Sequence, residues 1–107
     1  MTKYFLAATV AFSFVSCGNP APSANTCPSS IEISGTSYVT TSCTIKVGTP
    51  IIIRASNGHP LTGSGAKQTI SSATTDQNIA FAEAGTFNFT CDQHGAIGMK
   101  GLITVVP

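Results

Sequence analysis

The feature that most constrains this chain is the stretch Cys91–Met99, which reads Cys-Asp-Gln-His-Gly-Ala-Ile-Gly-Met. It places a thiol, an imidazole (His94) and a thioether within nine residues, directly before the last apolar run of the chain. Taken singly, such side chains are ordinary core residues, since cysteine acts as a small hydrophobe and methionine fills gaps. Their combination at this spacing, with His59 as the one other histidine, instead predicts a metal site. A purely structural role for all four is the alternative.

The donor types indicate which metal to expect. A mononuclear blue-copper site takes two histidines and a cysteine in a trigonal set, with a weak, long axial methionine. His59, Cys91, His94 and Met99 supply this set, and the chain has no further histidine. Zinc is the alternative metal, but a zinc site normally takes further cysteine or histidine ligands rather than a thioether. The sequence therefore predicts one copper ion held by these four residues.

The same residues resemble a known family. Cys91-x2-His94-x4-Met99 resembles the copper loop of the plastocyanin-like cupredoxins, which are type 1 blue copper proteins. Asn57-Gly58-His59 resembles the loop that carries their first histidine, and residues 84–90 resemble the strand that leads into their copper cysteine. The resemblance covers residues 31–107 and implies a Greek-key sandwich with both ligand loops at one end.

The chain departs from this family beside the first histidine. In many cupredoxins the next residue is asparagine, whose backbone N–H donates a hydrogen bond to the sulfur of the copper cysteine. Pro60 stands here and has no N–H to donate. The backbone N–H of Gln93, two residues after Cys91, is the other candidate donor to this sulfur. Pro60 and Gln93 are therefore expected to tune the site from outside the ligand set.

The rest of the domain alternates short strands and turns. β-Branched and aromatic residues gather in runs at 31–33, 38–40, 44–47, 51–55, 79–82, 87–90 and 102–106. This pattern predicts an all-β protein, an antiparallel Greek-key β-sandwich of six to eight short strands. Residues 61–68 contain two glycines and are predicted to form a loop. An immunoglobulin-like sandwich is the alternative, although the chain lacks the tryptophan that many such domains bury.

The N-terminal residues predict export. Lys3 precedes an uncharged run at 4–15, which is shorter than the about 20 residues that span a bilayer, so residues 1–16 are predicted to be a signal peptide. The sequence around Cys17 resembles a bacterial lipoprotein cleavage box, and Gly18 after it implies anchoring to the outer membrane. Ordinary cleavage near Gly18 is the alternative. Residues 17–26 are predicted to form an extended tether, and residues 27–107 are predicted to form the folded domain.

The cysteine count predicts one disulfide. Four cysteines allow three pairings if all of them pair. With Cys17 assigned to lipid and Cys91 to copper, Cys27 and Cys43 remain, and an exported protein meets an oxidising compartment. A bond between them would close a loop of about 17 residues and contribute about 3 kcal/mol. Two free, buried thiols are the alternative.

Composition limits the class of function. Charged residues make up 8% of the chain, against about 25% in typical soluble domains. The formal net charge is +1 and falls to zero without Lys3, so no basic patch for nucleic acid is expected. With both histidines in one site, none remains for a second metal cluster, and a non-enzymatic role is predicted.

These observations predict a one-electron carrier that cycles between Cu(II) and Cu(I), periplasmic or tethered to a membrane by lipid. A copper-buffering lipoprotein is the alternative, and a metal-free interaction module is the third class. We expect a monomer whose redox protein donor and acceptor dock beside His94, with little dependence on salt because charges are sparse. The predicted docking residues are small or apolar: Gly95, Ala96, Ile97 and Gly98.

Overall fold

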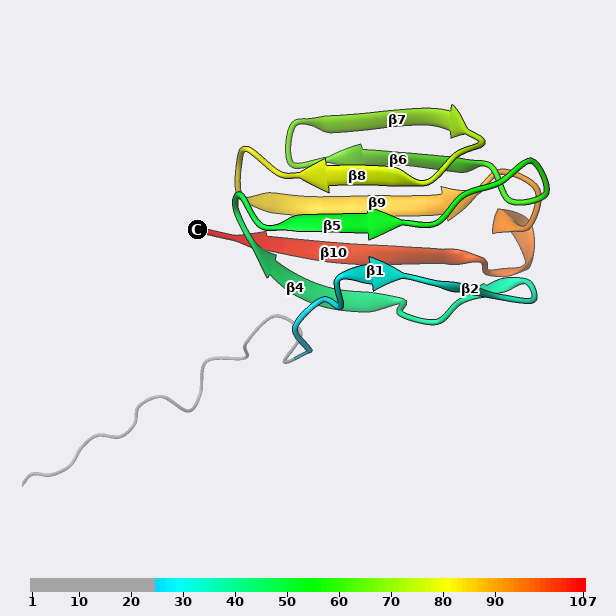
Figure 1. Cartoon of the computed structure of the whole chain (residues 1–107), viewed down its shortest axis with the longest axis horizontal. Helices are drawn as coiled ribbons and strands as arrows, with labels where there is room; N and C mark the ends of the chain where they lie inside the picture. The colour runs from blue at the N-terminus through cyan, green and yellow to red at the C-terminus, as the bar shows by residue number, and fades with distance from the viewer. Residues whose placement is uncertain (1–24) are drawn as a thin grey trace, which may run out of the picture.

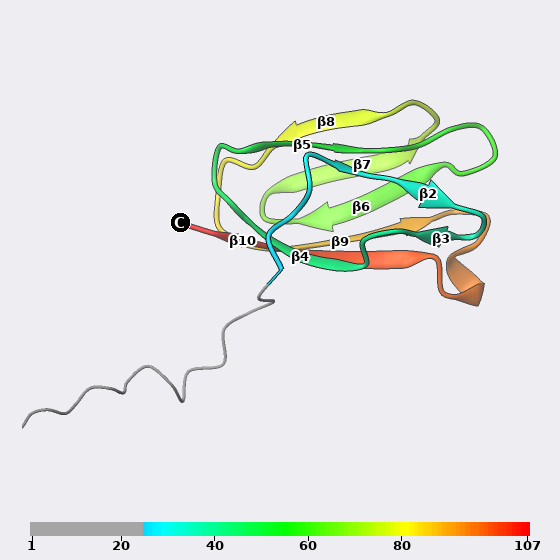
Figure 2. The ribbon, with the colours of Figure 1, turned by 60° about the horizontal axis from the view of Figure 1, so that its bottom comes forward.

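The computed structural model describes residues 25–107, which form a β-sandwich (Figures 1 and 2). The strands are β1 (Ser30–Ile31), β2 (Ile33–Ser34), β3 (Ser37–Tyr38), β4 (Ser42–Lys46), β5 (Pro50–Ile53), β6 (Leu61–Gly65), β7 (Gln68–Ala73), β8 (Gln77–Ala80), β9 (Gly85–Cys91) and β10 (Lys100–Val106). A short 3-10 helix, η3 (Gly95–Ile97), precedes β10. The predicted signal peptide, the Cys17 lipidation site and residues 18–24 of the predicted tether lie outside the described residues.

Two sheets make up the layers of the sandwich. One has five strands in the order β4-β10-β9-β6-β7, and the other has three in the order β1-β5-β8. Strands β2 and β3 form a small separate hairpin (Figure 2). The predicted all-β Greek-key sandwich is confirmed. Within residues 25–107 it is divided into ten strands rather than six to eight, and two pairs, β1 with β5 and β4 with β10, are parallel.

Alternating side chains from the facing sheets fill the core. Ile51 and Ile53 of β5 are fully buried, as are Phe87 and, almost completely, Phe89 of β9. The Phe81 and Phe87 rings meet edge to face with centroids 5.2 Å apart, a preferred aromatic geometry. Among the described residues the core contains no charged side chain. Burial of these alternate positions fixes the register of the strands, because a slip of one residue would turn every core side chain to solvent.

The prediction of a loop at residues 61–68 is wrong, because this segment forms β6, the turn and the start of β7. Gly63 lies in β6, where an added Cβ would lie 2.4 Å from Phe87 Cζ, so the ring occupies the space of the missing side chain. The connection to β7 has positive φ angles at Ala66 (48°) and Lys67 (62°), the conformation of a type I′ hairpin turn. Neither residue is the asparagine or glycine that would have indicated such a turn.

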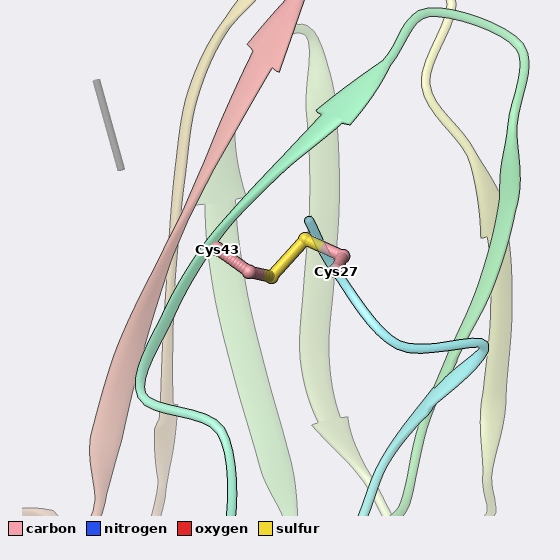
Figure 3. The surroundings of a disulfide bond; sticks show 2 residues. All are labelled: Cys27 and Cys43. Carbon is pink, nitrogen blue, oxygen red and sulfur yellow. A yellow bond between two sulfur atoms is a disulfide. The ribbon is translucent and has the colours of Figure 1, made fainter. Parts of the chain in front are cut away.

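The predicted disulfide is confirmed. Cys27 and Cys43 are bonded, with their Cα atoms 4.7 Å apart (Figure 3). The Cys27 N–H also donates to the Thr44 carbonyl at 2.9 Å, so the segment before β1 lies along β4. The bond thus joins the N-terminal segment of the domain to an edge strand of the larger sheet.

The ends of the strands determine where the site lies. Strands β5 and β9 run in the same direction in Figure 1, and the loops that follow them meet at one end of the sandwich, opposite the C-terminus. Those loops are residues 54–60 and 92–99. Within the described part of the chain, no helix is long and apolar enough to span a bilayer.

Candidate metal centre

The loop after β5 presents His59. Two backbone hydrogen bonds of 3.1 Å, one in each direction between Ser56 and His59, close a tight turn. Asn57 and Gly58 occupy its centre, in agreement with the turn expected from these residue types. The loop is also held at its base, because the Ala55 N–H donates to Asp76 Oδ1 at 3.0 Å. His59 therefore lies in a well-anchored turn rather than in a free loop.

The loop after β9 carries the remaining predicted ligands. Cys91 is the last residue of β9, and its N–H donates to the Met99 carbonyl at 2.9 Å. In turn the Met99 N–H donates to the His94 carbonyl at 3.1 Å. Gly98 adopts φ 100°, a left-handed conformation that suits glycine at the end of η3. The backbone of this loop therefore binds itself into a compact unit between β9 and β10.

Three donor atoms converge between the two loops. Cys91 Sγ lies 3.5 Å from His94 Nδ1 and 3.7 Å from His59 Nδ1, and all three donors lie within 4.8 Å of one another. Cys91 is fully buried, while both imidazoles are partly exposed. The two imidazole centroids are 4.9 Å apart with the rings tilted by 42°.

This spacing fits a trigonal metal site. Metal bonds of about 2.1 Å to an imidazole nitrogen and about 2.3 Å to a thiolate, set 120° apart, place nitrogen and sulfur about 3.8 Å from each other. The separations of 3.5 and 3.7 Å observed for Cys91 approach that value. The buried thiol and two imidazoles are also the trigonal donor set of blue copper. The residues present therefore fit a single copper ion.

The other predicted site residues lie around this centre. Met99 is 1% exposed and is hydrogen-bonded through its backbone to both Cys91 and His94. The axial role of its thioether stays a prediction. Gln93 donates its side-chain amide to the Asn57 carbonyl at 3.3 Å and so joins the two ligand loops. The tuning roles of Pro60 and Gln93 also stay predictions.

The predicted docking residues directly follow His94 in the chain. Ala96 and Gly98 are exposed, Gly95 is partly exposed, and Ile97 is 70% exposed. An exposed isoleucine at this level stands out in a chain whose other isoleucines are mostly buried. Contact of this surface with a redox protein stays a prediction.

Sequence reasoning missed the role of Asp92. Its Oδ2 accepts the Ser72 hydroxyl at 2.5 Å and its Oδ1 accepts the Thr62 hydroxyl at 2.6 Å. Hydrogen bonds from Ser72 and then Thr62 hold the pKa of Asp92 below its ordinary value. Thr62 and Ser72 belong to a hairpin whose first half was expected to be a loop. Their position beside Asp92 depends on the pairing of these strands, which could not be predicted from the sequence.

Tyr38 is a second residue that the sequence did not single out. Its ring packs edge to face on Phe89 with centroids 4.8 Å apart. Its buried hydroxyl has no hydrogen-bond partner among residues 25–107. Burial is the main cause that raises the pKa of Tyr38. A neutral phenol is therefore built into the wall of the core on the side of the ligand loop.

Comparison with known proteins supplies the family. The model for copper binding proteins of the plastocyanin/azurin family matches residues 25–106. The chain belongs to this family. The match takes in all four predicted ligands, so the cofactor of this cupredoxin is one copper ion in a type 1 site that includes His59, Cys91 and His94. No curated protein sequence matches the chain at a significant level.

Solved structures of amicyanins share the fold. Amicyanin from Paracoccus versutus (Thiobacillus versutus) is 21% identical, with a TM-score of 0.50, over 79% of this chain and 84% of that one. The Cu(I) form of an amicyanin mutant with a methionine replaced by alanine is 19% identical, with a TM-score of 0.53, over 71% and 79% of the two chains. At this level of identity, the likeness establishes that the cupredoxin has the same sandwich.

Proposed function

We propose that this cupredoxin is an exported one-electron carrier. The observation that carries the proposal is the convergence of the buried Cys91 thiol with His59 and His94 between two anchored loops. Copper bound there supplies a Cu(II)/Cu(I) couple. The chain contributes a fixed geometry, because backbone hydrogen bonds hold Cys91 and His94 to the Met99 backbone. A preformed site of this kind limits rearrangement when the charge of the metal changes.

The absence of further ligands in the sequence argues for electron transfer rather than catalysis. The chain has two histidines, and both contribute to the centre. An enzyme would use an open metal position or a second metal to activate a substrate. Met99 is buried at the end of the ligand loop and is proposed to close the axial position.

The surface around His94 is the proposed route for the electron. His94 is partly exposed, and Ile97 beside it is 70% exposed. We expect a donor and an acceptor protein to use this surface in turn, each bringing its own redox centre close to the His94 ring. The domain works as a monomer in this proposal, since the same face must stay free for both partners.

The proposed location is the periplasm, reached with the signal peptide at residues 1–16. In this proposal Cys17 carries the lipid, and residues 18–26 hold the domain away from the outer membrane. Support comes from the Cys27–Cys43 disulfide, a bond that persists in oxidising compartments such as the periplasm. Mass spectrometry of the protein from a membrane fraction would identify a lipidated Cys17.

Copper titration and voltammetry test the function. Adding Cu(II) to the purified protein should produce an intense visible thiolate-to-copper band at one copper per chain. A reversible voltammetric wave with fast electron self-exchange is expected of a carrier. A buffering protein would hold Cu(I) tightly and exchange electrons slowly, so slow self-exchange would contradict the proposed role.

Replacement of the thiolate provides the matched control. Cys91→Ser should abolish the visible band, because only a thiolate is the partner for this charge transfer, while the sandwich stays folded. Serine is close in volume to cysteine, so circular dichroism of the variant should match that of the unmodified protein. An intense band that persisted in Cys91→Ser with copper would refute the site.

A further inference from the structure

The carboxylate of Asp92 lies one residue beyond the copper thiolate and uses both of its oxygens. The Thr62 hydroxyl of β6 donates to Oδ1 at 2.6 Å, and the Ser72 hydroxyl of β7 donates to Oδ2 at 2.5 Å. Such short hydrogen bonds to an ionised acceptor are about twice as strong as those between neutral groups. Asp92 is exposed, yet its side chain is fixed by two neighbouring strands.

The backbone around Ser72 is distorted where it meets Asp92. Leu61 pairs with Ala73 but Gly63 pairs with Ile70, so an extra residue of β7 is accommodated opposite Thr62. This bulge places Ser72 at φ 47°, a left-handed conformation that is strained for a residue with a side chain. The Ser72 N–H donates to Thr62 Oγ1 at 3.0 Å. The same hydroxyl therefore accepts one hydrogen bond from Ser72 and donates another to Asp92.

The main chain of Asp92 is held as well. Its N–H donates to the Pro60 carbonyl at 2.9 Å, and Pro60 directly follows His59. Regular pairing of β9 with β6 ends one residue earlier, at Cys91 opposite Leu61. Beyond that point the orientation of the chain no longer follows from strand pairing. From there on the chain is held by the contacts of Asp92 with β6, β7 and the loop of His59.

We propose that Asp92 is a positioning residue that clamps the copper loop to the β6–β7 hairpin and thereby fixes Cys91. Its negative charge, one residue from the thiolate, favours the more positive oxidised metal. The inference rests on the copper assignment in the proposed function, but no contact of the clamp uses the side chain of a predicted ligand. Bulges that redirect side chains are common beside functional sites, and the strained Ser72 has this use here.

Amide exchange in the metal-free protein tests the clamp without copper. Asp92→Asn keeps the shape of the side chain but removes the charge, and Thr62→Val removes one donor without a change of charge. Both should speed exchange of the backbone amide at position 92, which donates to the Pro60 carbonyl, about tenfold or more, given the strength of hydrogen bonds to a charged group. Thr62→Ser keeps the hydroxyl and should restore slow exchange.

A charge-matched control separates position from charge. Glu83→Gln removes one carboxylate from the β8–β9 connection, which lies at the opposite end of the sandwich from the ligand loops (Figure 1). It should leave both the exchange rates and the visible copper band unchanged. In the copper-loaded protein Asp92→Asn should raise the potential, while Thr62→Val should shift the visible band with no charge removed.

The outcomes decide the proposal in either direction. Unchanged amide exchange in both Asp92→Asn and Thr62→Val would overturn the clamp, even if the potential moved, since a shift of potential alone is a charge effect. Equal effects from Glu83→Gln would overturn it too. Because exchange is measured without metal, a failed clamp and a failed electron-carrier function give different results.

Discussion

At the scale of single residues, burial alone does not separate the ligands from the core. Cys91, Met99 and Phe87 are all almost completely inaccessible, and only the neighbours of Cys91 give it a chemical role. Two imidazole nitrogens lie within 3.7 Å of its sulfur. The disulfide takes Cys27 and Cys43, which leaves Cys91 as the free thiol of the described residues. Its pairing with histidines, rather than its burial, makes it a ligand.

Met99→Leu tests the axial ligand. Leucine is close in volume to methionine, so the loss of stability should stay below about 1.5 kcal/mol although the side chain is fully buried. Loss of the weak axial donor to Cu(II) should raise the reduction potential while the visible band remains. Voltammetry and thermal unfolding of the two proteins measure both quantities. An unchanged potential would show that the Met99 sulfur does not reach the metal.

Pro60→Asn tests the missing N–H beside His59. The new backbone N–H is expected to donate to the Cys91 sulfur and to stabilise the electron-rich reduced site more than the oxidised one. A difference of about 1 kcal/mol would raise the potential by about 40 mV for one electron. The Pro60 carbonyl, which accepts the Asp92 N–H at 2.9 Å, is retained in the variant. A potential that fell, with the new N–H directed at the sulfur in a crystal structure, would contradict this role.

At the scale of elements, the sandwich positions the site by where its strands end. Strands β5 and β9 deliver His59 and Cys91 to one end, and both could be predicted from apolar alternation followed by turn residues. The ligand spacing is local, so Cys91 and His94 could be predicted as well, while the axial role of Met99 stays a prediction. β6 could not, because Gly63 replaces an alternating side chain where the Phe87 ring needs space. The Asp92 clamp depends on that strand and on a bulge, neither of which has a local signal.

Reduction of the Cys27–Cys43 disulfide should weaken the fold without changing the copper site. The bond joins the N-terminal segment to β4 at an edge of the larger sheet, and neither element carries a ligand. Its loss should lower the free energy of unfolding by about 3 kcal/mol on the chain-entropy model. Denaturant unfolding of Cys27→Ala/Cys43→Ala, with the visible spectrum recorded in parallel, measures both effects. A changed copper spectrum in this variant would show coupling that the topology does not provide.

At the scale of the whole molecule, all charges of the described domain lie on its surface and balance. Four positively charged side chains balance four negatively charged ones, and none of the eight is buried. They are Lys46, Arg54, Lys67 and Lys100 on one side and Glu32, Asp76, Glu83 and Asp92 on the other. The stability of such a domain comes from its apolar core and its disulfide. The dependence of this stability on acid pH is expected to come from its surface carboxyls. Two of the carboxyls whose pKa is lowered, Glu32 and Asp76, share one cluster. Arg54 contacts Glu32 at 3.1 Å and Asp76 at 2.9 Å, across the ends of β1, β5 and β8.

Acid should therefore destabilise the fold through these carboxyls. The Ala55 N–H and then Arg54 hold the pKa of Asp76 below its ordinary 3.8, and hydrogen bonds from Ser30 and then Arg54 hold that of Glu32 below 4.5. A carboxyl whose pKa is lower in the folded state stabilises the fold above its unfolded pKa, and the contribution disappears as pH falls through the folded value. Stability should thus be level from pH 7 to about 5 and decline below it.

Thermal unfolding of the metal-free protein between pH 7 and 3 measures this decline, and Asp76→Asn provides the comparison. The variant lacks the titrating carboxyl but keeps an oxygen for the Ala55 N–H, so its curve should start lower at pH 7 and fall less steeply in acid. Glu83→Gln is the matched control, because Glu83 contacts only Lys67, at 3.9 Å, among the ion pairs of residues 25–107. Its curve should run parallel to that of the unmodified protein. If Asp76→Asn declined as steeply as Glu83→Gln, the cluster around Arg54 would not be what links acidity to stability.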